Sequence, residues 1–331
     1  MSSRGRVVVV TGAGGFIGSH LVESLVAEGS KVRALVHYNA QGSIGALRHV
    51  DRHTLDAIEI VDGDVRDPYA MRSLVRGAQT VFHLAALIGI PYSYVAPASY
   101  VETNIGGTLI LLEATRAEGV ERLVVTSTSE TYGTAQYTPI DEMHPAVAQS
   151  PYAATKVGAD QLALSYYRAF NTPVCVVRPF NTFGPRQSER AIIPTIVAQA
   201  LRDTGPLRLG SLEPRRDLTY VTDTVRGFLV LAEHPDAIGR IANLGTGTSH
   251  SMEELVDVVG RVLGRDLRVV QDPARVRPER SEVRDLCADI RLARSLGWTP
   301  EVSLERGVHQ VVDFFRQLLP EPGAVSREYR I

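Results

Sequence analysis

A tyrosine and a lysine four residues apart carry the clearest chemical signal in this sequence. Lys156 is one of two lysines in the chain, the other being Lys31, although lysine and arginine together number 35. The spacing from Tyr152 to Lys156, on a helix expected to begin near Pro151, places both side chains on one face, one turn apart. A phenol, with a pKa of about 10, can act as a base near neutral pH only beside a positive charge.

We therefore expect Tyr152 to be a catalytic base and Lys156 to supply the charge that stabilises its phenolate. A pair of neighbours on a helix surface, without a catalytic role, is the alternative.

A second group of polar side chains follows the strand expected at residues 121–126. Residues 126–133 read Thr-Ser-Thr-Ser-Glu-Thr-Tyr-Gly, at the carboxyl edge where doubly wound sheets bind their ligands. We expect Thr128 and Glu130 to reach the same cleft as Tyr152 and Lys156, which brings together a hydroxyl, a carboxylate, a phenol and an ammonium. A surface carboxylate at the end of a strand is the alternative for Glu130.

A glycine-rich turn follows the first expected strand and opens the next helix. Glycines there let the backbone approach a pyrophosphate, whose charge then lies against free N–H groups at the positive end of the helix. A tight turn without a ligand is the alternative. We expect a dinucleotide to be bound by this turn, through Gly12, Gly14, Gly15, Phe16, Ile17 and Gly18.

The end of the second expected strand bears on the choice of dinucleotide. Many such sites place an acidic residue there to hold the ribose hydroxyls, but this sequence has Val36 followed by His-Tyr-Asn. Because these positions hold no arginine to receive a 2′-phosphate, NAD is favoured and NADP stays open. We expect Asp64 to bond the adenine amine and Asp67 to be suited to capping a helix from Pro68.

The first half of the chain alternates short β-branched runs with amphipathic stretches, which is typical of a parallel sheet covered by helices on both faces. We expect strands at residues 6–11, 31–37, 57–61, 80–83, 121–126 and 173–178, and helices at 15–28, 68–76, 97–118 and 151–170. The pattern predicts an α/β fold with a doubly wound parallel sheet.

The second half has a different texture. After about Arg178, prolines and glycines interrupt the chain, and shorter helices are expected at residues 222–233, 252–263 and 304–318. We predict a dinucleotide-binding domain at residues 1–178, a smaller C-terminal substrate lobe at 179–318 that is interleaved with it, and a loosely held tail at 319–331.

The composition excludes several classes of protein. The 331 residues are 44% hydrophobic and 22% charged, which is ordinary for a globular chain and excludes disorder. The formal charge of −2 offers no basic field for nucleic acid. Two cysteines indicate a reducing cytoplasm, and no run reaches the roughly 18 apolar residues of a membrane span. The histidines lack metal-ligand spacing, so we expect no metal.

Further segments resemble a known family. Residues 83–86 read His-Leu-Ala-Ala, residues 103–108 read Thr-Asn-Ile-Gly-Gly-Thr, and residues 178–186 read Arg-Pro-Phe-Asn-Thr-Phe-Gly-Pro-Arg. With the glycine turn and the Tyr152–Lys156 pair, they resemble the extended short-chain dehydrogenase/reductases of the nucleotide-sugar epimerase/dehydratase family, over nearly the whole chain. The resemblance implies a Rossmann fold and transient oxidation of a sugar at C4 by bound NAD.

Three stretches narrow the resemblance. Residues 85–94, 126–136 and 277–283 are similar to the 4,6-dehydratases that act on UDP-N-acetylglucosamine in the legionaminic acid route. The resemblance implies a UDP-linked sugar substrate, converted to a 4-keto-6-deoxy sugar.

In the implied reaction, Tyr152 takes the proton of the sugar 4-hydroxyl while Thr128 bonds the same oxygen, and Glu130 then removes the C5 proton so that water leaves from C6. Dehydratases that act on dTDP-glucose usually carry an aspartate before this glutamate. Here Ser129 stands in that place, which leaves Glu130 to carry both proton transfers.

The resemblance also implies binding residues. It places Leu84, Ala85, Ala86, Asn104 and Val65 in the cofactor site, together with Tyr152 and Lys156. It implies that Arg216 and Arg277 bind the diphosphate and that Asn181 bonds a phosphate or sugar oxygen, although each arginine could be an ordinary salt-bridged surface residue. The helices at residues 97–118 and 151–170 resemble those that pair across a two-fold axis, so we expect a homodimer.

Other activities fit parts of the same pattern. UDP-glucuronate decarboxylases share the Thr-Ser-Thr-Ser-Glu loop and begin with the same C4 oxidation. A 4-epimerase of the UDP-glucuronate or UDP-glucose type needs no Glu130, so the carboxylate argues against it. A catalytically silent dinucleotide-binding protein is a further alternative, against which the intact set of Thr128, Tyr152 and Lys156 argues.

Overall fold

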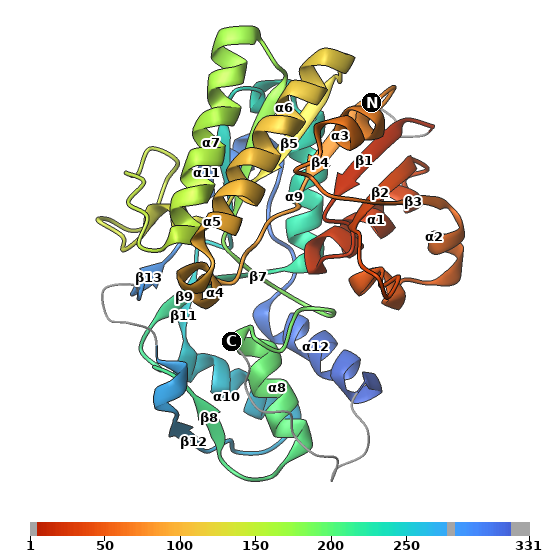
Figure 1. The fold of residues 1–331 in the computed structure, drawn as a ribbon. Helices are drawn as coiled ribbons and strands as arrows, with labels where there is room; N and C mark the ends of the chain where they lie inside the picture. Colours follow the sequence, from red (N-terminus) through yellow and green to blue (C-terminus); the bar gives the residue numbers. More distant parts are fainter. Residues whose placement is uncertain (1–4, 277–281, 319–331) are drawn as a thin grey trace.

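A seven-stranded parallel sheet forms the centre of the larger part of the molecule (Figure 1). The computed structural model describes residues 5–276 and 282–318. The strands lie in the order β10-β6-β5-β4-β1-β2-β3, so the chain reverses its direction across the sheet between β1 and β4. They are β1 (Val7–Thr11), β2 (Lys31–His37), β3 (Ile58–Gly63), β4 (Thr80–His83), β5 (Arg122–Thr126), β6 (Val174–Pro179) and β10 (Ile241–Leu244).

Helices cover both faces of this sheet. Val8 and Val10 point to the face covered by α1 (Phe16–Ala27) and α9 (Val221–Glu233), whereas Val9 points to the opposite face. The helices there are α3 (Pro68–Val75), α6 (Gly107–Glu118) and α7 (Pro151–Phe170), and α6 and α7 run side by side (Figure 1). Because both faces are buried, the strands are nearly continuous runs of β-branched residues.

The predicted α/β class and doubly wound sheet are confirmed, with two differences. The sheet has a seventh strand, β10, which comes from the part of the chain assigned to the second lobe and pairs with β6. The helix expected at residues 97–118 is a succession of α5 (Pro97–Tyr100), a π-helical turn η2 (Val101–Gly106) and α6. Sequence periodicity alone does not reveal such a local widening of a helix.

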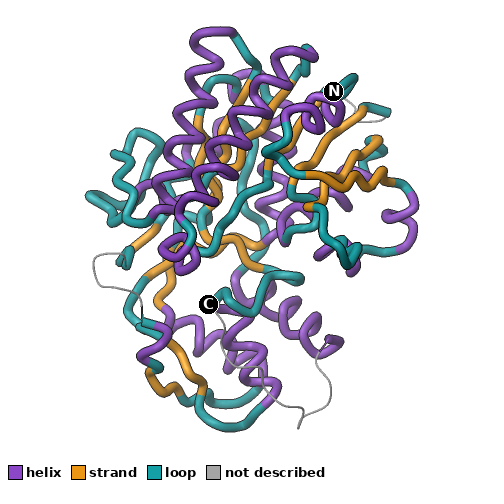
Figure 2. The backbone as a smooth tube through the Cα atoms, viewed as in Figure 1, coloured by secondary structure: helices purple, strands orange, loops and turns teal. Residues whose placement is uncertain are grey.

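A smaller lobe lies beyond the carboxyl edge of the sheet (Figure 2). In it, β9 (Arg215–Tyr220) pairs with β7 (Asn181–Phe183), β11 (Ser249–Ser251) and β13 (Asp285–Leu286), while β8 (Leu207–Leu209) pairs with β12 (Val269–Gln271). The helices packed around them are α8 (Ile192–Arg202), α10 (Met252–Leu263) and α12 (Leu304–Leu318).

Short elements complete the described chain. They are α2 (Arg52–Asp56), α4 (Ile90–Val95), α11 (Arg291–Ser295) and the single turns η1 (Gly45–His49), η3 (Ser129–Tyr132), η4 (Pro235–Ala237) and η5 (Pro273–Arg275). Across residues 5–276 and 282–318, no helix is both long and apolar enough to span a bilayer.

One buried carboxylate attaches the C-terminal part of the lobe to the sheet domain. Asp223, in the first turn of α9, is 2% exposed and accepts hydrogen bonds from the backbone N–H groups of Glu301 and Val302 at 2.9 and 2.8 Å. The Trp298 indole N–H donates to the Asp223 carbonyl at 2.8 Å. The segment that leads into α12 is therefore fixed to α9.

We predict that Asp223→Ala lowers the free energy of unfolding by about 2–3 kcal/mol, because two backbone N–H groups and the Arg226 guanidinium lose a buried charged acceptor. Urea unfolding followed by circular dichroism measures this difference. Asp313→Ala is the control: Asp313 pairs with Arg316 on the surface of α12, so its loss should change stability by less than about 0.5 kcal/mol. Equal losses in the two variants would contradict the prediction.

Candidate active site

The glycine turn between β1 and α1 is shaped by close backbone approaches. Gly12 has φ of +71°, and a Cβ there would lie 2.7 Å from the Ala85 nitrogen. A Cβ on Gly18 would collide with the Gly12 carbonyl oxygen, and one on Gly14 would lie 2.9 Å from the Ile44 carbonyl oxygen. Side chains are therefore excluded from the turn, and no side chain caps the start of α1 after Gly15. Its free N–H groups are available to a phosphate.

The loop after β4 lies against this turn. The Leu84 N–H donates to the Thr11 carbonyl at 3.1 Å, and the Ala85 N–H to the Thr11 hydroxyl at 3.2 Å. Asn104, in η2, accepts from the Leu87 N–H and donates to the Leu87 carbonyl and the Thr155 hydroxyl. The structure thus brings the glycine turn, Leu84–Ala86 and Asn104 together where the sheet reverses, which is where open α/β sheets bind ligands.

The other predicted cofactor residues lie at the edges of this region. The Phe16 ring contacts the lobe near Gly184, and Ile17 packs against the core. Val65 is buried against Gly107.

Asp64 already has a partner at the predicted adenine end. The Arg66 guanidinium donates to the Asp64 carboxylate and holds its pKa below the usual range. The adenine contact of Asp64 stays a prediction. Asp67 accepts from the Tyr69 and Ala70 N–H groups, which confirms it as the cap of α3.

The four predicted catalytic side chains come from α7 and from the turn after β5. Ser150 caps α7, so Tyr152 lies in its first turn, 7% exposed, and Lys156 follows one turn later, 4% exposed. Thr128 caps η3, whose first turn carries Glu130. Burial raises the pKa of Tyr152, a hydrogen bond with Thr128 lowers it, and the charge of Glu130 raises it. Thr128 and Glu130 are therefore near enough to the Tyr152 phenol to affect its ionisation.

The Lys156 side chain is buried one helical turn after Tyr152. Burial lowers the pKa of Lys156 to about 8, and the charge of Asp160 opposes this. Its Nζ donates to the Thr126 carbonyl at the end of β5 at 2.5 Å. Burial, with the Lys156 charge second, lowers the pKa of His83 to about 3. His83 is therefore a neutral core residue, placed between the Thr11 and Thr108 hydroxyls at 2.8 and 3.1 Å.

Three further residues support the site and were not singled out from the sequence. The Tyr100 ring meets the Tyr152 ring edge-on at 6.3 Å, and this contact joins positions too far apart in the chain for any local pattern to indicate. Asp160 and Arg178 form a buried ion pair at 2.7 Å. Asp160 follows Lys156 at the same four-residue spacing that links Lys156 to Tyr152, so the helix face did carry a signal for it.

Two of the predicted substrate residues, Asn181 and Arg216, lie in the smaller lobe. Asn181, on β7, has a buried carboxamide oxygen without a hydrogen-bond partner in the described part of the chain. Arg216, on β9, is 7% exposed and donates to the Val283 carbonyl at 2.7 Å and to the Glu282 carboxylate at 2.9 Å. Arg277 lies outside the described residues. The roles of all three toward a diphosphate stay predictions.

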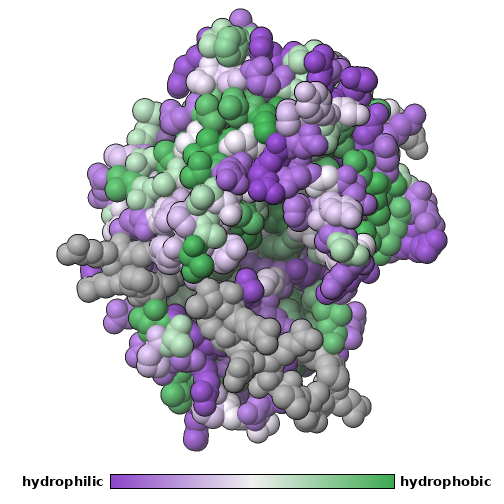
Figure 3. Space-filling view, viewed as in Figure 1, coloured by the Kyte–Doolittle hydropathy of each residue, from purple (hydrophilic) through white to green (hydrophobic). Residues whose placement is uncertain are grey.

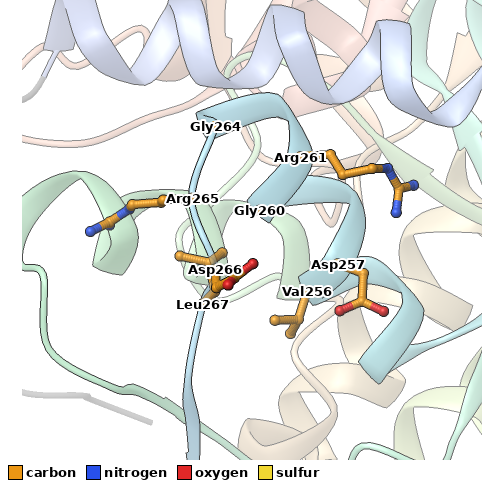
Figure 4. Close-up of a pocket in the computed structure, with 8 residues that line it drawn as sticks. All are labelled: Val256, Asp257, Gly260, Arg261, Gly264, Arg265, Asp266 and Leu267. Atoms are coloured by element: carbon orange, nitrogen blue, oxygen red, sulfur yellow. The ribbon is translucent and has the colours of Figure 1, made fainter.

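The surface is hollowed between the sheet domain and the smaller lobe (Figure 3). A different hollow lies at the end of α10 (Figure 4), where Arg261 and Arg265 point to opposite sides and no set of side chains converges. Within residues 5–276 and 282–318, no three His, Cys, Asp or Glu side chains are grouped as metal ligands. Tyr152 and three side chains near it, Thr128, Glu130 and Lys156, form the candidate catalytic group.

Comparison with known proteins agrees with this geometry. Residues 9–311 match the family profile described as GDP-mannose 4,6 dehydratase. The chain belongs to the NAD-dependent epimerase/dehydratase family. As a member of this family, it is an enzyme that modifies nucleotide sugars.

Relatives in this family carry three different activities. The chain is 29% identical to a putative UDP-glucose 4-epimerase of Methanocaldococcus jannaschii, over 94% of this chain and 98% of that one. It is 30% identical to UDP-glucuronic acid decarboxylase 2 of Arabidopsis thaliana, over 96% and 70%. The structure of DesIV, a dTDP-glucose 4,6-dehydratase of Streptomyces venezuelae with NAD and TYD bound, matches with a TM-score of 0.83 and 32% identity, over 94% and 97%.

We predict that Lys156→Met makes the protein more stable at pH 7, by about 2–3 kcal/mol. The pKa of Lys156 is about 8 in the folded protein and 10.5 when unfolded, so folding disfavours the bound proton. This cost is fully present below pH 8 and disappears as the pH rises toward 10.5, so the two unfolding curves should converge there. Urea unfolding at several pH values measures the difference.

Lys31→Met is the matched control, because Lys31 is the other lysine and its side chain is exposed. It should leave stability unchanged across the same pH range. A Lys156→Met protein less stable than the parent at pH 7 would show that the buried ammonium stabilises the fold.

Proposed function

We propose that the protein is a NAD-dependent 4,6-dehydratase of a UDP-hexose such as UDP-N-acetylglucosamine. The observation that supports this most is the position of Glu130. Its carboxylate acts on the Tyr152 phenol through its charge, yet within the described residues it has no hydrogen bond or ion pair of its own. A carboxylate that faces the base and is not engaged elsewhere is available for proton transfer at a neighbouring carbon.

The glycine turn fits a dinucleotide, because it leads into the uncapped start of α1, where backbone N–H groups can receive a phosphate. NAD bound there would accept a hydride from sugar C4 and later return it to C6. Leu84–Ala86 and Asn104 would line the nicotinamide end, and Asp64 and Val65 the adenine end. The end of β2 has no arginine for a 2′-phosphate, which favours NAD over NADP.

Tyr152, Thr128 and Lys156 act on the sugar 4-hydroxyl. Tyr152 takes its proton, and the Thr128 hydroxyl holds the same oxygen. Burial raises the pKa of Tyr152, so the phenol is neutral until positive charge is brought to it. Lys156 provides such a charge below pH 8, and a cationic nicotinamide ring would add a second.

Glu130 acts on the ketone that this oxidation forms. A carbonyl at C4 acidifies the C5 proton, which Glu130 removes. The same carboxyl then protonates the departing C6 hydroxyl, so that water leaves. Ser129, the residue before it, is buried and carries no carboxylate, so Glu130 is the acid within reach.

Decarboxylation and epimerisation share the first step and differ afterwards. A UDP-glucuronate decarboxylase would use the same Thr128, Tyr152 and Lys156, and the loop that carries Glu130 also suits it. A 4-epimerase would return the hydride to the other face of C4 and would need no carboxylate at residue 130. The half-buried Glu130, whose charge acts on the Tyr152 phenol, favours the dehydratase over the epimerase.

Two further proposals accompany this function. Asn181, Arg216 and Arg277 would bind the phosphates and the sugar from the smaller lobe. A homodimer would pair α6 and α7 of two copies, and Leu109, Tyr167 and Phe170, which are 39%, 36% and 51% exposed, supply apolar surface on these helices.

Mass spectrometry of the products tests the proposed function. The purified protein is incubated with UDP-N-acetylglucosamine and, separately, with UDP-glucuronic acid. We expect loss of water from the first and no change in the second, and no product from Tyr152→Phe. Tyr69→Phe, at an 87% exposed position, serves as the matched control and should retain full turnover.

The other outcomes point to the alternatives. Loss of carbon dioxide from UDP-glucuronic acid would assign the protein to the decarboxylases. A product of unchanged mass but altered stereochemistry would make it an epimerase.

We predict that Glu130→Gln separates the two chemical steps. The variant should still form transient NADH with the sugar, because Tyr152 and Lys156 are intact, but its dehydration rate should fall by about 10²-fold or more. Absorbance of NADH and mass spectrometry report the two steps separately. Glu121→Gln, which removes a carboxylate exposed on the far edge of the sheet, should behave as the parent. If Glu130→Gln dehydrated the sugar at the parental rate, Glu130 would have no part in proton transfer.

A further inference from the structure

A buried carboxylate lies on the Tyr152–Lys156 face of α7, one turn beyond Lys156. Asp160 is 0% exposed and accepts hydrogen bonds at its Oδ2 from the Ser127 hydroxyl at 2.7 Å and from the Arg178 guanidinium at 2.7 and 3.1 Å. Its Oδ1 is buried without a partner in the part of the chain that the structure describes. Its charge is therefore only partly compensated by hydrogen bonds.

Arg178 connects this carboxylate to the turn that carries Glu130. Its guanidinium carbon lies 4.7 Å from the centre of the Tyr132 ring, and Tyr132 is the last residue of η3. The Tyr132 hydroxyl donates to the Asn243 side-chain oxygen at 2.7 Å, which fixes the ring against β10. The buried Arg178 guanidinium thus contacts Asp160, on the helix that carries Tyr152 and Lys156, and Tyr132, on the turn that carries Glu130.

The charges of Lys156, Asp160 and Arg178 together favour loss of the proton from the Tyr152 phenol. Lys156 and Arg178 are cations and Asp160 is an anion, so these three side chains with a neutral Tyr152 carry one net positive charge; Glu130, whose charge raises the pKa of Tyr152, lies outside this sum. The sum becomes neutral when Tyr152 loses its proton. Without Arg178, the charge of Asp160 would offset that of Lys156, and these side chains would present no net positive charge to the phenolate. Because water is excluded, these interactions are strong.

We infer that Asp160 and Arg178 are positioning residues of the active site: Asp160 maintains the charged form of Lys156, and Arg178 balances Asp160 while holding the Glu130 turn in place. The inference rests on the proposed function only through the first oxidation, which dehydratases, decarboxylases and epimerases share.

The other titratable groups around Lys156 do not replace Asp160. His83 on β4 is neutral, and Tyr152 on α7 is neutral until it acts as a base. Glu130 on η3 acts on Tyr152, and Arg178 on β6 is paired with Asp160. Among the described residues, Asp160 is the one whose charge raises the pKa of Lys156.

Carbon-13 NMR of lysine labelled at Cε tests this inference directly, because the chain has two lysines and Lys31→Arg leaves one signal. In the protein without substrate, we expect Asp160→Asn to lower the pKa of Lys156 by about one pH unit. Asp217→Asn is the matched control: Asp217 is also 0% exposed, but its partners are Thr246 and backbone N–H groups. It should leave the Lys156 titration unchanged.

Arg178→Met supplies a second, opposite test should Asp160→Asn fail to fold. It releases the Asp160 carboxylate toward Lys156, so the pKa of Lys156 should rise, whereas Arg178→Lys keeps the charge and should restore the parental titration. An unchanged Lys156 signal in Asp160→Asn, or a fall in Arg178→Met, would overturn the inference. Neither readout needs turnover, so a failure of the proposed dehydration leaves this test valid.

Discussion

A buried ammonium is the constraint on which this active site depends. Lys156 is 4% exposed, so water stabilises its charge very little and protein groups must stabilise it instead. The support is the Thr126 carbonyl on one side and the charge of Asp160 on the same helix. Each of these groups in turn fixes something else: Thr126 ends β5 just before the Thr128–Glu130 turn, and Asp160 holds Ser127 and Arg178. The placement of the four candidate catalytic side chains depends on how the protein accommodates this one cation.

The sheet determines where that cation can act. Parallel strands all end at one edge, and the chain reverses direction between β1 and β4, which leaves a gap between the helices that follow them. The glycine turn after β1, the loop after β4 and the Thr128–Glu130 turn after β5 therefore meet at one edge. The smaller lobe lies beyond that edge, on the side where these turns meet (Figure 1).

Sequence patterns predicted the local parts of this arrangement well and the long-range parts poorly. Helix spacing placed Tyr152 and Lys156 together, and the boundaries of α7, α10 and α12 follow from caps and periodicity. The strand β10 was missed because it lies in the second half of the chain, outside the alternating pattern, and its pairing with β6 is a tertiary event. α8 was missed because Pro194 interrupts its pattern, although a proline in the first turn of a helix removes no hydrogen bond. Tyr100 and Arg178 belong to the site only through folding.

The position of β10 at the edge of the sheet has a consequence for how the protein is made. Asn243 on β10 accepts from the Tyr132 hydroxyl and donates to the Ile140 carbonyl, so the floor of the Glu130 turn is completed by a segment more than a hundred positions later. When the glycine turn and α7 have been synthesised, β10 and its Asn243 have not yet been made. The nascent chain must wait for β10 before its catalytic residues have their final support, and such distant closure slows folding. The sheet domain is therefore complete only when β10 has joined it.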